Sequence, residues 1–183
     1  RYDAATELSE PQTVGVGLDL DVARRWNVAL EGVWMGWAAA EREMPFILTN
    51  GGNPNVNILV NADPTNGSFT YPFPLYWKDS WTGKIGVEFR ATERTTLRGG
   101  YLYGTNPVPE RTVFVTFPAI SSQALTIGVG FELLGVPLEA SLVHALNAAE
   151  TGTPTQHLLG AEYQGSYTTM QQNVLTLGAV WRY

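Results

Sequence analysis

The stretch from Trp77 to Tyr103 alternates between two kinds of side chain, and this alternation limits the fold more than any other feature of the chain. One parity of its first half is mainly apolar and the other mainly polar or charged: Trp77, Trp81, Ile85, Val87 and Phe89 against Lys78, Lys84, Glu88 and Arg90. Successive side chains of a strand point to opposite faces, so the pattern predicts a strand with one apolar face. Residues 91–94 form a turn and residues 96–103 return, which predicts a long antiparallel hairpin.

Two folds fit such a hairpin. In a soluble sandwich the apolar face packs against a second sheet, whereas in a membrane barrel it meets lipid and the charged face lines a lumen. No apolar run approaches the roughly 20 residues of a membrane helix. The hairpin alone does not decide between the two folds.

The lengths of the connections favour the barrel. The same two-residue period predicts five further strands, at residues 13–20, 26–34, 124–132, 138–143 and 174–183, with residues 1–10 irregular. The connections run short, long, short, medium, short, medium, the longest being the loop at 38–76. Antiparallel strands with this order have all tight turns at one end and all long loops at the other. Outer-membrane barrels have this asymmetry.

Aromatic residues gather at both ends of the predicted strands. We expect the long-loop end to carry Trp34, Trp37, Trp77, Trp81, Tyr101 and Tyr103, and the short-turn end Trp26, Phe89, Phe131, Trp181 and Tyr183. Two aromatic belts are what two membrane–water interfaces select. A strand of about 11 residues, tilted by roughly 45°, spans about 25 Å, the height of the apolar band. The sequence therefore predicts an all-β fold, an antiparallel transmembrane β-barrel.

Composition excludes several other classes of protein. The formal net charge of −6 argues against a nucleic-acid partner. The chain has no Cys, so it has neither disulfides nor a Cys-based metal site. Its 183 residues suffice for one domain with a sizeable core.

An ordered set of short stretches resembles a known family. The stretches are 11–17, 25–30, Trp34-x-x-Trp37, 77–81, 97–101 and 106–109. In this order they resemble the carboxy-terminal half of the FadL-like outer-membrane transporters of long-chain fatty acids and hydrocarbons. The end of the chain, Thr176-x-Gly178-x-x-Trp181-x-Tyr183, also resembles the signal that the barrel-assembly machinery reads.

The resemblance implies a location, a function and an incomplete barrel. Family members are 14-stranded, multi-pass barrels of the bacterial outer membrane with an amino-terminal plug, the hatch. They pass fatty acids, alkanes or aromatic hydrocarbons through the barrel without an energy source, after capture at the extracellular loops. Residues 1–183 would be the carboxy-terminal part, about seven strands, with the hatch and the first strands absent. The implied partners are a hydrophobic ligand, outer-membrane lipid, the missing amino-terminal half and the assembly machinery.

Physical reasoning also predicts that seven strands are not enough. An odd number of strands puts the termini on opposite sides, whereas single-chain bacterial barrels have an even number. Each unsatisfied backbone group in hydrocarbon costs several kcal/mol, so an edge of about ten residues costs tens of kcal/mol. That exceeds the net stability of a typical domain. We therefore expect a fragment, or one part of a split barrel.

The predicted lumen face carries acids and bases in about equal number: Glu31, Lys84, Glu88, Arg90, Arg98, Glu132, Glu139 and Arg182. The favoured interpretation is a network of paired charges, which is the norm for barrel lumens. The alternative is that Lys84 or Arg98 binds the carboxylate of a ligand.

Two apolar patches interrupt the long loop. They contain Phe46, Ile47 and Leu48 in the first patch, and Phe73 and Leu75 in the second. Exposed apolar patches often mark binding sites, but long loops also pack on themselves. The patches are therefore candidates for first capture of a hydrophobic ligand, with self-packing as the equal alternative.

The sequence offers little for catalysis. Ser141 and His144 lie three residues apart on a predicted strand and face opposite sides, so they cannot pair as nucleophile and base. With His157 as the only other histidine, no metal constellation forms, and we expect no metal and no cofactor. The chain is predicted not to be an enzyme. A structural or adhesive barrel, for phage or host contact, is the alternative to transport.

Overall fold

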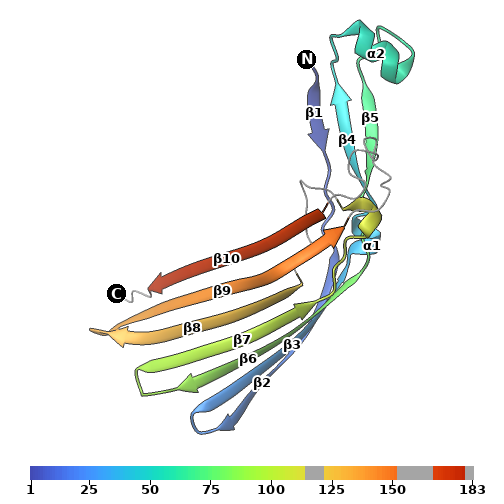
Figure 1. Cartoon of the computed structure of the whole chain (residues 1–183). Helices are drawn as coiled ribbons and strands as arrows, with labels where there is room; N and C mark the ends of the chain where they lie inside the picture. Colours follow the sequence, from blue (N-terminus) through green and yellow to red (C-terminus); the bar gives the residue numbers. More distant parts are fainter. Residues whose placement is uncertain (114–121, 152–166, 180–183) are drawn as a thin grey trace.

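Two antiparallel sheets of very different size form the protein in this computed structural model, which describes residues 1–113, 122–151 and 167–179 (Figure 1). The large sheet has seven strands in the order β10-β9-β8-β7-β6-β3-β2. Its strands are β2 (Gln12–Ala23), β3 (Trp26–Gly36), β6 (Ser80–Arg90), β7 (Thr95–Gly104), β8 (Gln123–Leu133), β9 (Val136–Thr151) and β10 (Tyr167–Ala179). The predicted all-β, antiparallel architecture is confirmed.

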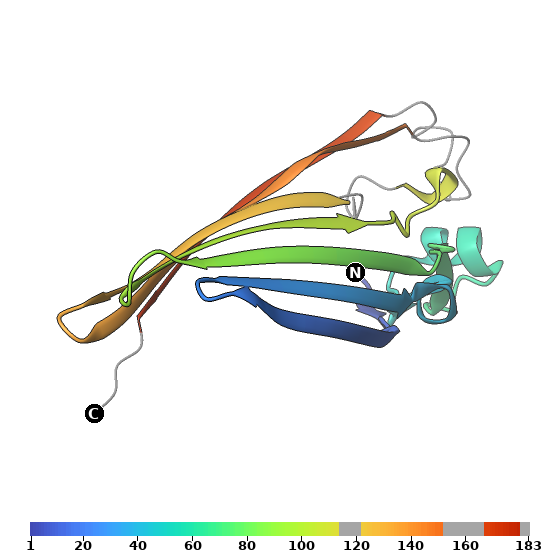
Figure 2. The ribbon, with the colours of Figure 1, turned by 90° about the horizontal axis from the view of Figure 1, so that it is seen from below.

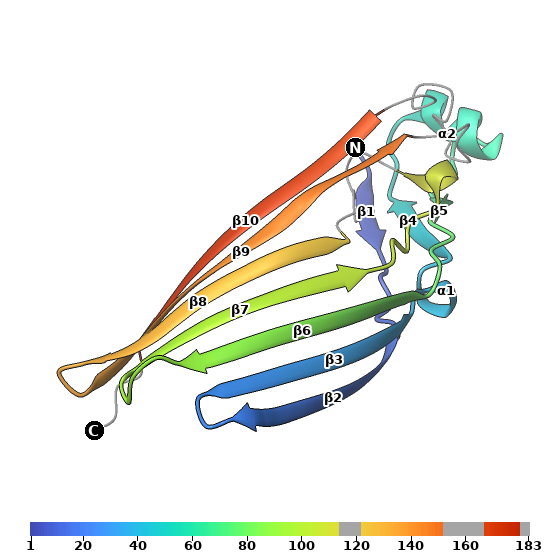
Figure 3. The same cartoon turned by 60° about the horizontal axis from the view of Figure 1, so that its bottom comes forward.

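The tight turns and the long connections lie at opposite ends of the large sheet. The β2–β3, β6–β7 and β8–β9 turns lie together at one end, and the small sheet with both α-helices lies at the other (Figure 3). The amino terminus lies near the small sheet and the last described strand runs toward the turn end. In register, Trp34 opposes Trp81 at the loop end, and Trp26 opposes Phe89 at the turn end. The predicted asymmetry of the connections is confirmed.

The large sheet is a single curved layer (Figure 2). Its inner face carries Lys84, Glu88 and Arg98, and its outer face carries Ile127 and Leu177. The side chains of Ile127 and Leu177 are 64% and 73% exposed, since no second layer among the described residues covers them. The sandwich alternative required such a layer. Strands β2 and β10 form the two edges of the layer.

The small sheet and two helices form a second unit, here called the rim. Its strands are β1 (Asp3–Thr6), β4 (Glu43–Thr49) and β5 (Phe69–Pro74) in the order β1-β4-β5, and its helices are α1 (Trp37–Ala40) and α2 (Pro54–Asn61). Helix α2 begins where the Asn53 side chain accepts a hydrogen bond from the Asn55 N–H, with Pro54 in the first turn. It ends at Ala62 in the left-handed conformation.

Three sequence predictions about the elements were wrong. Residues 1–10 and the 38–76 loop are not irregular, because residues 3–6 pair with residues 46–49, which lie forty or more positions later in the sequence. The strand predicted from Trp77 begins only at Ser80: Tyr76 has φ 47°, and the Trp77 and Lys78 N–H groups bond to the carbonyls of Glu41 and Pro107. Strands β9 and β10 reach into the predicted 147–171 loop, where an irregularity between Met170 and Gln172 hides the alternation.

A short 3-10 helix, η1 (Glu110–Thr112), belongs to the connection after β7 and contacts the rim. The Thr112 hydroxyl donates to the Leu75 carbonyl at 2.6 Å. The connections that follow β3 and β7 therefore meet at the loop end of the barrel wall. No helix within the described ranges is long and apolar enough to cross a membrane.

Candidate functional site

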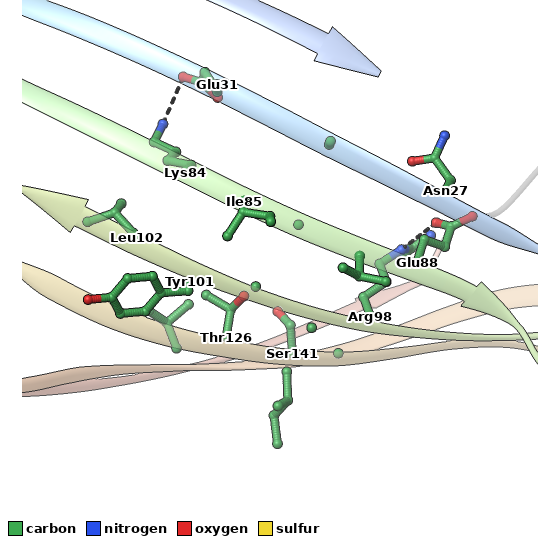
Figure 4. A pocket seen from close by; sticks show the side chains of 18 of the residues that line it. Asn27, Glu31, Lys84, Ile85, Glu88, Arg98, Tyr101, Leu102, Thr126 and Ser141 are labelled. Carbon is green, nitrogen blue, oxygen red and sulfur yellow. Dashed lines mark hydrogen bonds and ion pairs between the residues drawn. The ribbon is translucent and has the colours of Figure 1, made fainter. Parts of the chain in front are cut away.

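The inner face of the large sheet borders a cavity of about 670 Å³. Strands β3, β6, β7, β8, β9 and β10 all contribute to its walls. Small residues on the inner parity, including Gly86, Gly100, Gly128 and Gly178, keep the backbone open to the cavity. Charged side chains from five strands line it: Asp19, Glu31, Lys84, Glu88, Arg98 and Glu139. Figure 4 shows four of them, Glu31, Lys84, Glu88 and Arg98.

Lys84 on β6 and Glu31 on β3 are direct cross-strand neighbours. The Lys84 Nζ lies 2.9 Å from the Glu31 Oε1, and both side chains remain nearly half exposed to the cavity (Figure 4). Opposite charges at directly opposed positions attract one another across a sheet. Lys84 therefore points into the cavity but is already paired with a carboxylate of the protein.

Arg98 on β7 bridges two carboxylates on different strands. Its Nε lies 3.0 Å from the Glu88 Oε2 on β6, and its Nη1 lies 3.1 Å from the Glu139 Oε1 on β9. To reach Glu139 the guanidinium crosses β8 above Gly130, where a Cβ atom would be 3.6 Å from the Arg98 Nη1. A side chain larger than alanine would therefore block this bridge.

Most residues of the predicted charge network therefore form ion pairs. Arg90 adds a contact with Glu88 at 3.5 Å and a longer one with Asp21 at 3.8 Å. Glu132 shares the inner parity, and Arg182 lies outside the described residues. The pairing supports the network interpretation, while a ligand role for Lys84 or Arg98 stays a prediction.

The two apolar patches of the long connection pack on each other in the rim. Met44 pairs with Phe73 and Phe46 with Tyr71 across β4 and β5. The rings of Phe46 and Phe73 meet edge to face with centroids 5.5 Å apart. Met44 is only 2% exposed, and Phe73 and Leu75 are also buried. Self-packing thus accounts for Phe46 and Phe73.

The remaining patch residues lie in different surroundings. Ile47 and Leu48 are half-buried within β4, between β1 and β5. Leu75 lines a smaller cavity of about 260 Å³ at the base of the rim, together with Trp37, Glu41 and Trp77. Ligand contact by all five predicted patch residues stays a prediction. Sequence reasoning missed Glu41, because the segments around this cavity are far apart in the chain and share no periodic pattern.

The predicted interface aromatics fall into three groups. Trp26 stacks near Phe89 at the turn end with centroids 4.5 Å apart, and Trp34 lies 6.5 Å from Trp81 at the loop end. The Tyr101 hydroxyl donates to the Gln123 side chain at 2.7 Å on the outer face near the loop end. Trp77 belongs to the rim cavity and contacts Trp37 edge to face at 5.0 Å, while Trp181 and Tyr183 lie outside the described residues.

The two residues weighed for catalysis lie on opposite faces of β9. Ser141 lines the inner cavity. His144 opposes Leu125 on the outer face, and its Nδ1 lies 2.6 Å from the Asn173 Oδ1. Within residues 1–113, 122–151 and 167–179, no three His, Cys, Asp or Glu side chains are placed to hold a metal ion.

A single layer of long antiparallel strands, apolar outside and charged inside, with tight turns at one end, is the wall of a transmembrane β-barrel. Residues 1–179 match the sequence model of the family described as outer membrane protein transport protein (OMPP1/FadL/TodX), and the chain belongs to this family. It is therefore a protein of the outer membrane of Gram-negative bacteria. No curated protein matches the sequence.

Solved structures of similar fold are barrels of the same family. The toluene transporter TbuX of Ralstonia pickettii is 17% identical, with a TM-score of 0.64. The matched region covers 97% of this chain and 35% of the TbuX chain. A FadL homologue of Pseudomonas aeruginosa has a TM-score of 0.66 and 16% identity, covering 96% and 36%. The toluene transporter TodX of Pseudomonas putida has a TM-score of 0.59 and 17% identity, covering 80% and 32%. The chain thus spans about a third of the length of these proteins.

Proposed function

We propose that the protein is part of a passive outer-membrane channel for hydrophobic small molecules. The observation that carries the proposal is the family match over residues 1–179, on a sheet whose inner face borders an open cavity. The candidate ligands are long-chain fatty acids, alkanes and aromatic hydrocarbons, and the similarity to the toluene transporters TbuX and TodX supports the last of these. Catalysis is not part of the proposal, because the family is one of transport proteins.

The path that we propose begins at the rim and continues along the inner face. We propose the five patch residues for first contact with ligand: Phe46, Ile47, Leu48, Phe73 and Leu75. Ile47 and Leu48 are half-buried and Leu75 lines the smaller cavity, while Phe46 and Phe73 also pack against each other. Lys84 and Arg98 keep the inner wall polar and ordered through their carboxylate partners. A ligand without charge passes such a wall without breaking these pairs.

We also propose that further strands close the barrel. Both edge strands, β2 and β10, offer a row of backbone groups that hydrocarbon cannot satisfy. An amino-terminal part with additional strands and a hatch would pair with these edges, and outer-membrane lipid and the assembly machinery would be its other partners. The isolated 183-residue chain should therefore not insert into liposomes as a heat-resistant monomer.

Uptake measurements test the proposal. Cells that produce the full-length protein should take up labelled toluene or fatty acid faster than cells that lack it. Uptake of a small sugar by the same cells is the control for general permeability. Equal uptake in both strains would contradict a transport role.

A structural or adhesive role is the second candidate, favoured by the surface of α2. Val56, Ile58 and Leu59 are all exposed on this helix beyond the end of the barrel wall. Loss of phage or host-cell binding after polar substitution of these three residues, with uptake unchanged, would favour that role.

A further inference from the structure

The small cavity at the base of the rim has mainly apolar walls. It lies between residues 8–11, the segment that leads into β2, and the rim residues Trp37, Met44, Leu75 and Trp77. Met44 and Leu75 belong to the buried core of the rim, and the two Trp rings contact each other edge to face. This wall of the cavity is therefore part of the packed core of the rim.

A buried carboxylate closes one side of this cavity. Glu41 is 4% exposed, and its Oε1 accepts a hydrogen bond from the Ser9 N–H at 3.0 Å. The bond holds residues 8–11 against the rim. Glu10 is the other charged residue in the wall, and no Lys or Arg of the described chain lines the cavity. The charged groups at the cavity are therefore all acidic.

Size and charge together select a ligand class. An apolar cavity of about 150 Å³ is enough to hold benzene. The cavity here, about 260 Å³, has room for one ring with small substituents. A ligand carboxylate would meet the Glu41 carboxylate where little water screens the two charges, and this repulsion disfavours anions.

We propose that this cavity is a binding subsite for uncharged hydrocarbons of single-ring size, and that Glu41 excludes anions of the same shape. The inference rests on the proposed function, because it names the ligand class that the channel would accept at its outer end. It also assigns Glu41 a positioning role, since its hydrogen bond to Ser9 shapes the cavity wall.

Toluene and benzoate test the proposal, because the two share a ring and differ in charge. Purified full-length protein in nanodiscs is dialysed against each labelled compound at pH 7, with empty nanodiscs as the background. Toluene should bind at least about tenfold more tightly than benzoate. Glu41→Gln keeps the shape and the acceptor for Ser9 but removes the charge, so it should raise benzoate affinity several-fold and change toluene affinity much less. Equal affinities in the wild type, or an equal effect of E41Q on both compounds, would overturn the proposal.

A cavity-filling variant tests the location. Leu8 lines the cavity and is largely exposed, so Leu8→Trp fills the space without disturbing the rim core. It should weaken toluene binding about tenfold or more. Leu59→Trp, at an 83% exposed position of α2 away from the cavity, is the matched control and should change nothing. Unchanged toluene binding in L8W would contradict the assigned site.

Uptake in cells distinguishes a failure of the proposed subsite from a failure of the proposed transport function. If the full-length protein speeds toluene uptake but L8W and E41Q bind as the wild type does, the subsite is wrong and the transport proposal stands. If no hydrophobic compound is taken up faster but L8W still weakens toluene binding, the subsite is right and the transport proposal fails.

Discussion

The outer face of the large sheet and the core of the rim use the same kinds of side chain in opposite ways. On the sheet, large aliphatic residues such as Ile127 and Leu177 are mostly exposed. In the rim, Met44, Phe73 and Leu75 are buried against one another. The two regions are joined directly, since β3 runs into α1 and β5 leads into β6.

This difference shows that the two regions are built for different solvents. Fully burying a Leu or Ile side chain is worth about 1.5–3 kcal/mol in water. The outer face leaves many such residues exposed, so in water it would forfeit an amount comparable with the net stability of a domain, about 5–15 kcal/mol. Hydrocarbon removes that cost. The core of the rim buries Met44, Phe73 and Leu75, as the core of a protein surrounded by water does.

The largest expected effect comes from cutting a side chain down in each region. Met44→Ala leaves a cavity in the rim and should lower its free energy of unfolding by about 2–5 kcal/mol. Ile127→Ala, the matched change on the outer face, leaves no cavity because lipid fills the space, so it should cost less. Hydrogen exchange of the β4 and β8 amides in the full-length protein measures both. Equal costs would contradict the assignment of two solvents.

A charge placed on either face of β8 sharpens the comparison within one strand. Ile127→Arg on the outer face should destabilise the folded barrel by about 2–4 kcal/mol, whereas Thr126→Arg on the inner face should cost little. The measurement is urea unfolding of the full-length protein in liposomes. A greater loss at position 126 than at position 127 would show that the faces are assigned the wrong way round.

Removing a base from the inner network should have a smaller effect. Arg98→Gln takes away both ion pairs, but these side chains are partly exposed to the aqueous lumen, so each pair is worth about 0–1 kcal/mol. Lys84→Gln is the matched control, with one ion pair lost. Double-mutant cycles with Glu139→Gln and Glu31→Gln measure the couplings. A fatty-acid uptake defect in R98Q and K84Q with unchanged stability would instead support ligand binding by these bases.

The smallest expected effect concerns the tip of the rim. Hydrogen bonds from the hydroxyl and the backbone N–H of Thr65 lower the pKa of Asp63 below its ordinary value. Because the pKa of Asp63 is lowered in the folded turn, the ionised carboxylate stabilises the turn at pH above the ordinary pKa of Asp. This stabilisation is lost as the pH falls through the lowered pKa. Exchange of the Thr65 amide should therefore quicken below about pH 4, and Asp63→Ala should remove this pH dependence. An unchanged profile in D63A would contradict the role of the carboxylate.

The large sheet was predictable from the sequence because lipid and lumen impose a strict two-residue period. β8 shows this most simply, with Leu125, Ile127 and Phe131 on one face and Thr126 between them on the other. The bulge near Met170 interrupts that period, so the sequence predicts shorter strands for β9 and β10 than the structure has. The alternation of side chains indicates a strand only where the hydrogen-bonded pairing with its neighbour is regular.

The rim was not predictable in the same way, because its pairings are remote. β1 carries only four residues and gains its partner, β4, from a segment about forty residues later. Trp77 fits the parity of β6 but leaves the strand, since its N–H bonds to the Glu41 carbonyl. The cavity beside Glu41 depends on the same remote contacts, which no spacing in the sequence records.

The most direct test of the account is the accessibility of consecutive positions along β8 in a bilayer. Residues 1–183 contain no Cys, so a spin label can be attached at single cysteines introduced at residues 125 to 130, in full-length protein from which any other cysteine is removed. Oxygen, which concentrates in hydrocarbon, should relax the label most at 125, 127 and 129, and a water-soluble nickel complex should do so at 126, 128 and 130. Accessibility to the nickel complex at Ile127 equal to that at Thr126 would contradict a lipid-facing outer surface.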